Sequence, residues 1–108
     1  MILNKTTNQQ FNIKITCADT FFKRFRGLMG KGDIDFAMLF LGFTDSSIHT
    51  HFMRFDIDVY FLDEEKIVFE KVTLKPWKFF KPKKQAKYIL ETKKGALKIR
   101  TGDSLEFI

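Results

Sequence analysis

The feature that most constrains the fold is the length of the apolar runs, which turn residues interrupt every few positions. AMLFLGF (37–43) and IVFEKVTL (67–74) have the length and the aromatic or β-branched content of β-strands. Further strand-like segments are 11–16, 48–55, 57–62, 88–91 and 104–108. Gly, Asp, Ser and Pro separate many of these segments. The pattern predicts a mainly β fold, a small rolled sheet or barrel of short, mostly antiparallel strands.

One or two short helices are expected to accompany the strands. In ADTFFKRFRGLMG, apolar residues recur at spacings of three and four after a candidate N-cap at Asp19 or Thr20. The main helix is therefore predicted between Asp19 and Met29, and a short helical turn over 93–99. The chain has 108 residues and no repeat or linker, so we expect a single domain, 1–108.

The composition supports a packed interior. The 14 Phe residues and a hydrophobic content of 44% supply enough apolar surface for a core. The one cysteine, Cys17, excludes an intrachain disulfide, and we expect its thiol to be buried and unreactive. The first ten residues lack the apolar segment of a signal peptide, and no apolar run approaches the ~20 residues that span a bilayer. These features predict a cytoplasmic protein without a membrane span.

The formal charge of +6 is unevenly distributed along the chain. From Lys66 to Arg100 there are twelve Lys and Arg against two acids, whereas the remaining residues carry seven basic and eleven acidic side chains. Such polarity favours an anionic partner, such as nucleic acid, an acidic protein or a membrane surface. The alternative is that the lysines only keep a Phe-rich surface soluble.

Several short motifs, weak individually, occur together in a specific order. They are RFRGLM (24–29), MLFLGF (38–43), IHTHFMRFDIDVYFLD (48–63), Pro76-Trp77, YILE (88–91) and TGDSLEF (101–107). In this order they resemble the small prokaryotic family named domain of unknown function 192, over nearly the whole chain from about Phe11. The resemblance implies a compact, mainly β fold and a packing role for Pro76-Trp77. It implies no enzyme class, because the family has no established activity.

The chain departs from this family at a few positions. Members often have a residue other than His where this chain has His51, which weakens a metal site built on a His pair. The family commonly has Pro where this chain has Asp56. Many bacterial members carry an export signal that this chain lacks, which agrees with an intracellular location.

A polar cluster within 48–58 offers a candidate metal or anion site. On a regular strand His49, His51 and Met53 would share one face and could ligate Cu(I), or Zn(II) with an added carboxylate. No paired Cys or further His cluster completes the coordination shell, so we predict no metal and no cofactor. The alternative is a structural role, in which the two His side chains stack on Phe residues and Met53 packs in the core.

Two arginines suggest a different use of the same region. Arg24 and Arg54 could meet Asp58 or Asp56 and, with His49, form a pocket for a phosphate or carboxylate. The same residues could instead form a structural ion pair between the predicted helix and the sheet. The candidate ligand-binding residues are Arg24, His49, Arg54 and Asp58.

The segment LKPWKFFKPKKQAKY interleaves cations with aromatic rings. Exposed rings and lysines together are what single-stranded nucleic acid requires, because bases stack and phosphates need counter-charge. The absence of Arg argues against base-specific recognition. The candidate polyanion-binding residues are Lys75, Trp77, Lys78, Lys81, Lys83, Lys84 and Lys87.

Catalytic patterns are weak. The chain has no nucleophile-elbow or phosphate-loop glycine pattern, and its serines lie in turns or at a strand start. We therefore predict a non-catalytic domain that binds a small anionic ligand or a macromolecular partner. The alternatives are a small enzyme or metal site centred on His49, and nucleic-acid binding through 75–88.

Overall fold

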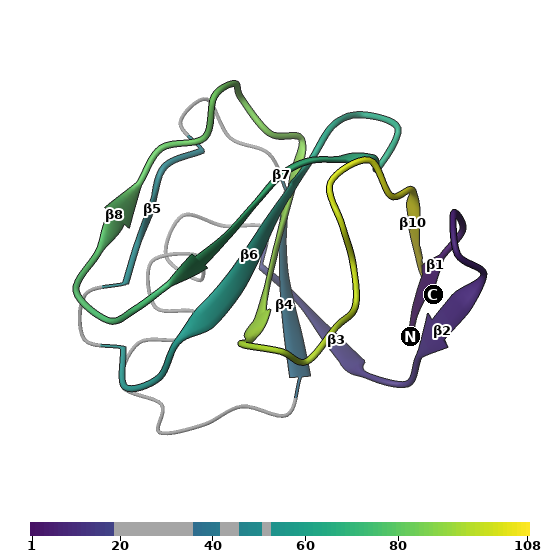
Figure 1. Ribbon diagram of the computed structural model, residues 1–108, viewed down its shortest axis with the longest axis horizontal. Helices are drawn as coiled ribbons and strands as arrows, with labels where there is room; N and C mark the ends of the chain where they lie inside the picture. Colours follow the sequence, from purple (N-terminus) through teal and green to yellow (C-terminus); the bar gives the residue numbers. More distant parts are fainter. Residues whose placement is uncertain (19–35, 42–45, 51–52) are drawn as a thin grey trace.

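A computed structural model describes residues 1–18, 36–41, 46–50 and 53–108, and these residues form ten strands and no helix (Figure 1). The predicted mainly β fold is confirmed, while the helix predicted between Asp19 and Met29 lies outside the described residues. The strands are β1 (Ile2–Asn4), β2 (Gln9–Phe11), β3 (Lys14–Ala18), β4 (Phe36–Leu41), β5 (Ile48–His49), β6 (Ile57–Leu62), β7 (Val68–Leu74), β8 (Phe79–Phe80), β9 (Tyr88–Lys93) and β10 (Leu105–Phe107).

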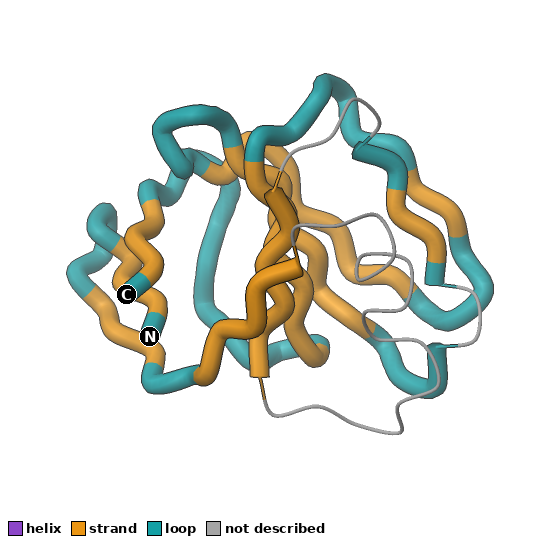
Figure 2. Tube along the Cα trace, turned by 180° about the vertical axis from the view of Figure 1, so that it is seen from behind, coloured by secondary structure: helices purple, strands orange, loops and turns teal. Residues whose placement is uncertain are grey.

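The strands form three sheets. The largest has the order β3-β4-β9-β6-β7, in which only the β3–β4 pair is parallel. A three-stranded antiparallel sheet, β10-β1-β2, and an antiparallel β5-β8 pair complete the described strands. Figures 1 and 2 show these two smaller sheets on opposite sides of the five-stranded sheet.

Both faces of the five-stranded sheet are buried. All six residues of β6 are buried, and their side chains alternate between two hydrophobic clusters. Ile57, Val59 and Phe61 pack in the first cluster, with Ile48 of β5. Tyr60 and Leu62 pack in the second, with residues of the three-stranded sheet. Unbroken apolar runs such as 37–40 are explained by this double coverage.

Three local expectations are wrong. Residues 93–99 contain a β-turn instead of a helical turn, since the N–H of Ala96 donates to the carbonyl of Lys93 (3.1 Å) and Gly95 has a φ of 79°. The predicted strand 11–16 is interrupted between β2 and β3. Cys17 is exposed, because it lies on β3, an edge strand of its sheet.

Strand 48–55 is shorter than expected, since β5 ends at His49. In the part of the chain that the structure describes, there is no helix long and apolar enough to cross a membrane.

Candidate functional site

Asp58 has a buried carboxylate whose two oxygens both accept hydrogen bonds from the protein. Its Oδ1 accepts a hydrogen bond from the Thr73 hydroxyl (2.6 Å), and its Oδ2 accepts one from the N–H of Gly95 (2.9 Å). Thr73 lies directly opposite on β7, and the positive φ of Gly95 belongs to the turn after β9. These contacts tie three chain segments together, which is a structural task.

Tyr60 lies two residues further along β6, on the same face as Asp58. Its hydroxyl donates to the carbonyl of Leu97 (3.4 Å), and its side chain is fully buried. Burial, and secondarily the negative charge of Asp58, raises the pKa of the Tyr60 phenol well above its usual range. Tyr60 therefore stays a neutral hydrogen-bond donor at any physiological pH.

The described members of the predicted anion pocket lie apart. Asp58 faces the second cluster with Tyr60, whereas β5, which carries His49, covers the opposite face of the sheet through Ile48. Arg54 is exposed, and Arg24 lies outside the described residues, as does His51. Within the described ranges, no three His, Cys, Asp or Glu side chains are grouped as a metal site would require.

The basic loop, defined here as residues 75–87, is the most exposed aromatic and cationic segment of the described chain. All six of its lysines are exposed. Trp77 is 60% exposed and Phe79 is 66% exposed, so neither is a core residue. The packing role that the family resemblance implied for Trp77 is therefore wrong as far as the core is concerned. Phe80, by contrast, packs on Phe61 with a ring-centroid distance of 5.7 Å.

Thr50 fixes the first turn of the basic loop. Its hydroxyl donates to the carbonyl of Lys75 (2.6 Å) and accepts from the N–H of Lys78 (2.7 Å), so it bridges the two ends of the turn 75–78. The backbone N–H of Thr50 also donates to the carbonyl of Lys78 (2.8 Å), and the carbonyl of Thr50 accepts from the N–H of Trp77 (2.9 Å). The side chain of Thr50 is 1% exposed, so water does not compete for these bonds.

Within this turn, Pro76 and Trp77 occupy the two central positions. Trp77 has a φ of 64°, in the left-handed region where Gly or Asn is usual. A bulky aromatic residue in this region carries roughly 1–2 kcal/mol of strain. The Thr50 contacts hold it there, and the indole is presented at the surface.

The remainder of the basic loop is anchored through its backbone. The N–H of Lys83 donates to Glu70 Oε1 (2.8 Å), and the N–H of Ala86 donates to Ser46 Oγ (2.9 Å). The Lys84 ammonium lies 4.6 Å from the centroid of the Phe69 ring. The loop is thus a fixed segment with exposed side chains.

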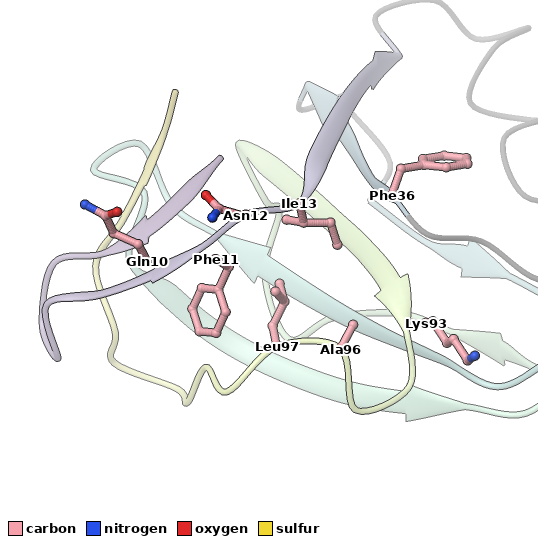
Figure 3. Close-up of a pocket in the computed structure, with 8 residues that line it drawn as sticks. All are labelled: Gln10, Phe11, Asn12, Ile13, Phe36, Lys93, Ala96 and Leu97. Atoms are coloured by element: carbon pink, nitrogen blue, oxygen red, sulfur yellow. The ribbon is translucent and has the colours of Figure 1, made fainter.

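Two open hollows are found beside the described residues. One, of about 430 Å³, lies where the chain passes from β2 to β3 and is lined by residues such as Phe11, Ile13 and Leu97 (Figure 3). The other, of about 510 Å³, lies between residues 63–65 and the end of the basic loop. The first contains none of the predicted site residues, and the second contains Lys84 and Lys87.

Sequence reasoning found the basic loop but missed Thr50. The pattern of lysines and aromatic rings was visible in the sequence, whereas a threonine between two histidines gave no local signal. Its role depends on contacts 25 and 28 residues away along the chain. The Pro76-Trp77 pair was the one visible sign of a turn at this point.

The chain is similar to UPF0127 proteins of Thermococcus and Pyrococcus species. It is 40% identical to a UPF0127 protein of Thermococcus sibiricus, over 99% of this chain and 74% of that protein. It is also 40% identical to a UPF0127 protein of Pyrococcus furiosus, over 98% of this chain and 97% of that protein.

Two solved structures share the fold at 18% identity. One is a protein of unknown function from Novosphingobium aromaticivorans, with a TM-score of 0.85 over 98% of this chain and 83% of that one. The other, from Sinorhizobium meliloti, is named as a candidate transcription regulator and has a TM-score of 0.84 over 97% of this chain and 88% of that one. The family model DUF192, described as "Uncharacterized ACR", matches residues 2–107. The chain therefore belongs to the DUF192 family.

Proposed function

We propose that the protein binds single-stranded nucleic acid through the basic loop and acts as a non-catalytic domain. The observation that carries this proposal is the exposure of Trp77, held by Thr50 in a left-handed turn and flanked by exposed lysines. An indole kept at the surface under backbone strain is more costly than a polar residue would be. Stacking with a base is a use that offsets this cost.

The chemistry of the loop matches a single strand. Each base stacked on an aromatic ring contributes about 1–3 kcal/mol whatever the base, and each neutralised phosphate adds affinity that salt weakens. Trp77 and Phe79 supply two exposed rings, and the lysines around them supply the counter-charge. In a duplex the bases are paired and stacked on one another, so they offer no free face on which Trp77 or Phe79 could stack. We therefore favour a single strand, RNA or DNA, over a duplex.

Two further observations agree with this proposal. The name of the Sinorhizobium meliloti neighbour is compatible with a nucleic-acid partner, although 18% identity extends to the fold alone. A cytoplasmic location is part of the proposal, because the exposed free thiol of Cys17 persists in a reducing compartment. An anion site that includes Arg24, His49 and Arg54 stays an alternative, without Asp58, whose carboxylate is bound to Thr73 and Gly95.

The proposal can be tested through intrinsic fluorescence, because Trp77 is the only tryptophan of the chain. The protein is titrated with oligo(dT) and oligo(U) of about 12 nucleotides at low salt, with heparin as a polyanion that has no bases. We expect both oligonucleotides to quench Trp77 emission, and heparin to bind without that quenching.

The matched control is Leu41→Ala, which removes another exposed apolar side chain outside the basic loop. It should leave oligonucleotide affinity unchanged, whereas Trp77→Ala should weaken it by about 1–3 kcal/mol. The proposal is wrong if neither oligonucleotide binds at low salt, or if duplex binds as tightly as single strands with the same quenching.

A further inference from the structure

The first half of the basic loop, residues 75–81, has a uniform electrostatic character. It carries Lys75, Lys78 and Lys81 around the exposed rings of Trp77 and Phe79. None of these three lysines lines the hollow that residues 63–65 share with Lys84 and Lys87. The charged side chains of residues 75–81 themselves are lysines alone, so this half offers a phosphate only cations of its own.

The second half, residues 83–87, lies against the acidic turn, defined here as residues 63–65 between β6 and β7. The N–H of Lys87 donates to the carbonyl of Leu62 (2.8 Å), immediately before this turn. Lys84 and Lys87 share the hollow of about 510 Å³ with all three acidic residues of the turn. Figure 1 shows the loop running from the end of β7, past β8, to the opposite end of the sheet where β6 meets β7.

The acidic turn opposes the lysines of this second half. Glu64 and Glu65 are exposed, and the Asp63 carboxylate is fixed by hydrogen bonds from the N–H groups of Glu65 (2.9 Å) and Ile67 (3.0 Å). Glu70 lies beside Lys83, because its Oε1 accepts a hydrogen bond from the backbone N–H of Lys83. At salt near 0.1 M, charges within about 10 Å still act on a bound phosphate. The carboxylates therefore offset much of the attraction that Lys83, Lys84 and Lys87 exert.

From this asymmetry we propose that a bound single strand contacts the first half of the basic loop only, and that the acidic turn determines where the strand leaves the protein, which presupposes the function proposed above. The contact region takes about three phosphates, alternating with bases stacked on Trp77 and Phe79. The log–log dependence of affinity on salt then has a slope of about −2, since each neutralised phosphate contributes about −0.7. Engagement of all six lysines would give about −4.

The test compares three double variants of the full chain by fluorescence anisotropy with labelled oligo(dT) of about 12 nucleotides, over a salt series. The first is Lys78→Gln with Lys81→Gln, in the first half. The matched second is Lys84→Gln with Lys87→Gln, in the second half. The third is Glu64→Gln with Glu65→Gln, in the acidic turn. All six side chains are exposed, and thermal unfolding verifies that each variant folds.

We expect the first variant to flatten the slope by about 1.4 and the second to leave it nearly unchanged. The third should bind more tightly and with a steeper slope, because phosphates can then reach Lys84 and Lys87. The inference is overturned if the two lysine variants flatten the slope equally, or if the acidic-turn variant binds like the wild type. Absence of any binding by the wild type is a separate result, which removes the proposed function itself.

Discussion

Replacement of Thr50 by valine isolates the contribution of one hydroxyl group to the basic loop. Valine has nearly the shape of threonine, so the buried position stays filled and the backbone bonds of residue 50 remain. What disappears is the bridge between the carbonyl of Lys75 and the N–H of Lys78. Each buried polar group left without a partner costs about 1–3 kcal/mol. Lys75 and Lys78 are themselves exposed, so their freed backbone groups can turn toward water once the hydroxyl is gone. We therefore expect the lower end for each group, about 2 kcal/mol in total.

Urea denaturation and calorimetry measure this loss. For a domain of this size 2 kcal/mol corresponds to a Tm lower by roughly 8 °C. The control is Thr50→Ser, which keeps the hydroxyl and deletes one methyl group, at a cost of about 1 kcal/mol. The near-ultraviolet circular dichroism of Trp77 should weaken in the valine variant and persist in the serine variant. A valine variant as stable as the wild type, or more stable than the serine variant, would refute the role assigned to the hydroxyl.

Three further outcomes are expected. Trp77→Ala should lower the free energy of unfolding by at most about 0.5 kcal/mol in urea denaturation, because the indole is exposed. Trp77→Gly should be more stable than Trp77→Ala, because the φ of residue 77 is positive. A loss of roughly 3–5 kcal/mol for Trp77→Ala would instead mark a core residue. Asp58→Ala should destabilise the fold by about 1–3 kcal/mol, because the hydroxyl of Thr73 and the N–H of Gly95 lose their shared acceptor, and unchanged denaturation would contradict this. Above pH 10 the unfolded chain releases the Tyr60 proton while the folded chain retains it, so the free energy of unfolding falls as pH rises. Tyr60→Phe should remove part of that fall. Parallel pH profiles for the wild type and the variant would contradict this expectation.

The sequence predicted the strands that bury both faces better than the short or exposed ones. The apolar run at 37–43 and the strand at 57–62 correspond to β4 and β6, because burial on two sides leaves an unmistakable pattern. β1 and β8 were not expected, since strands of two or three residues carry little periodicity. The turn after β9 was predicted as helix although the segment contains Gly95, whose positive φ belongs to a turn.

The candidate sites divide in a similar way. A cluster that is dense along the chain, such as His49 to Asp58, was expected to be dense in space. His49 instead lies on β5, which covers one face of the five-stranded sheet, whereas the side chain of Asp58 on β6 faces the other side. The basic loop was predictable because it is contiguous. Its anchor Thr50 was not, because the fold creates that contact between distant segments.

The double burial of β6 has a consequence for how the protein selects one fold. Ordinarily, a strand displaced by one residue turns its apolar side chains to water, and this cost enforces the native alignment. In β6 both sets of side chains are buried, so such a slip would merely exchange the occupants of the two clusters. Asp58 breaks this near-symmetry, because its carboxylate finds Thr73 and Gly95 in one alignment only. A leucine at position 58 could therefore yield a chain that remains compact yet samples several strand alignments.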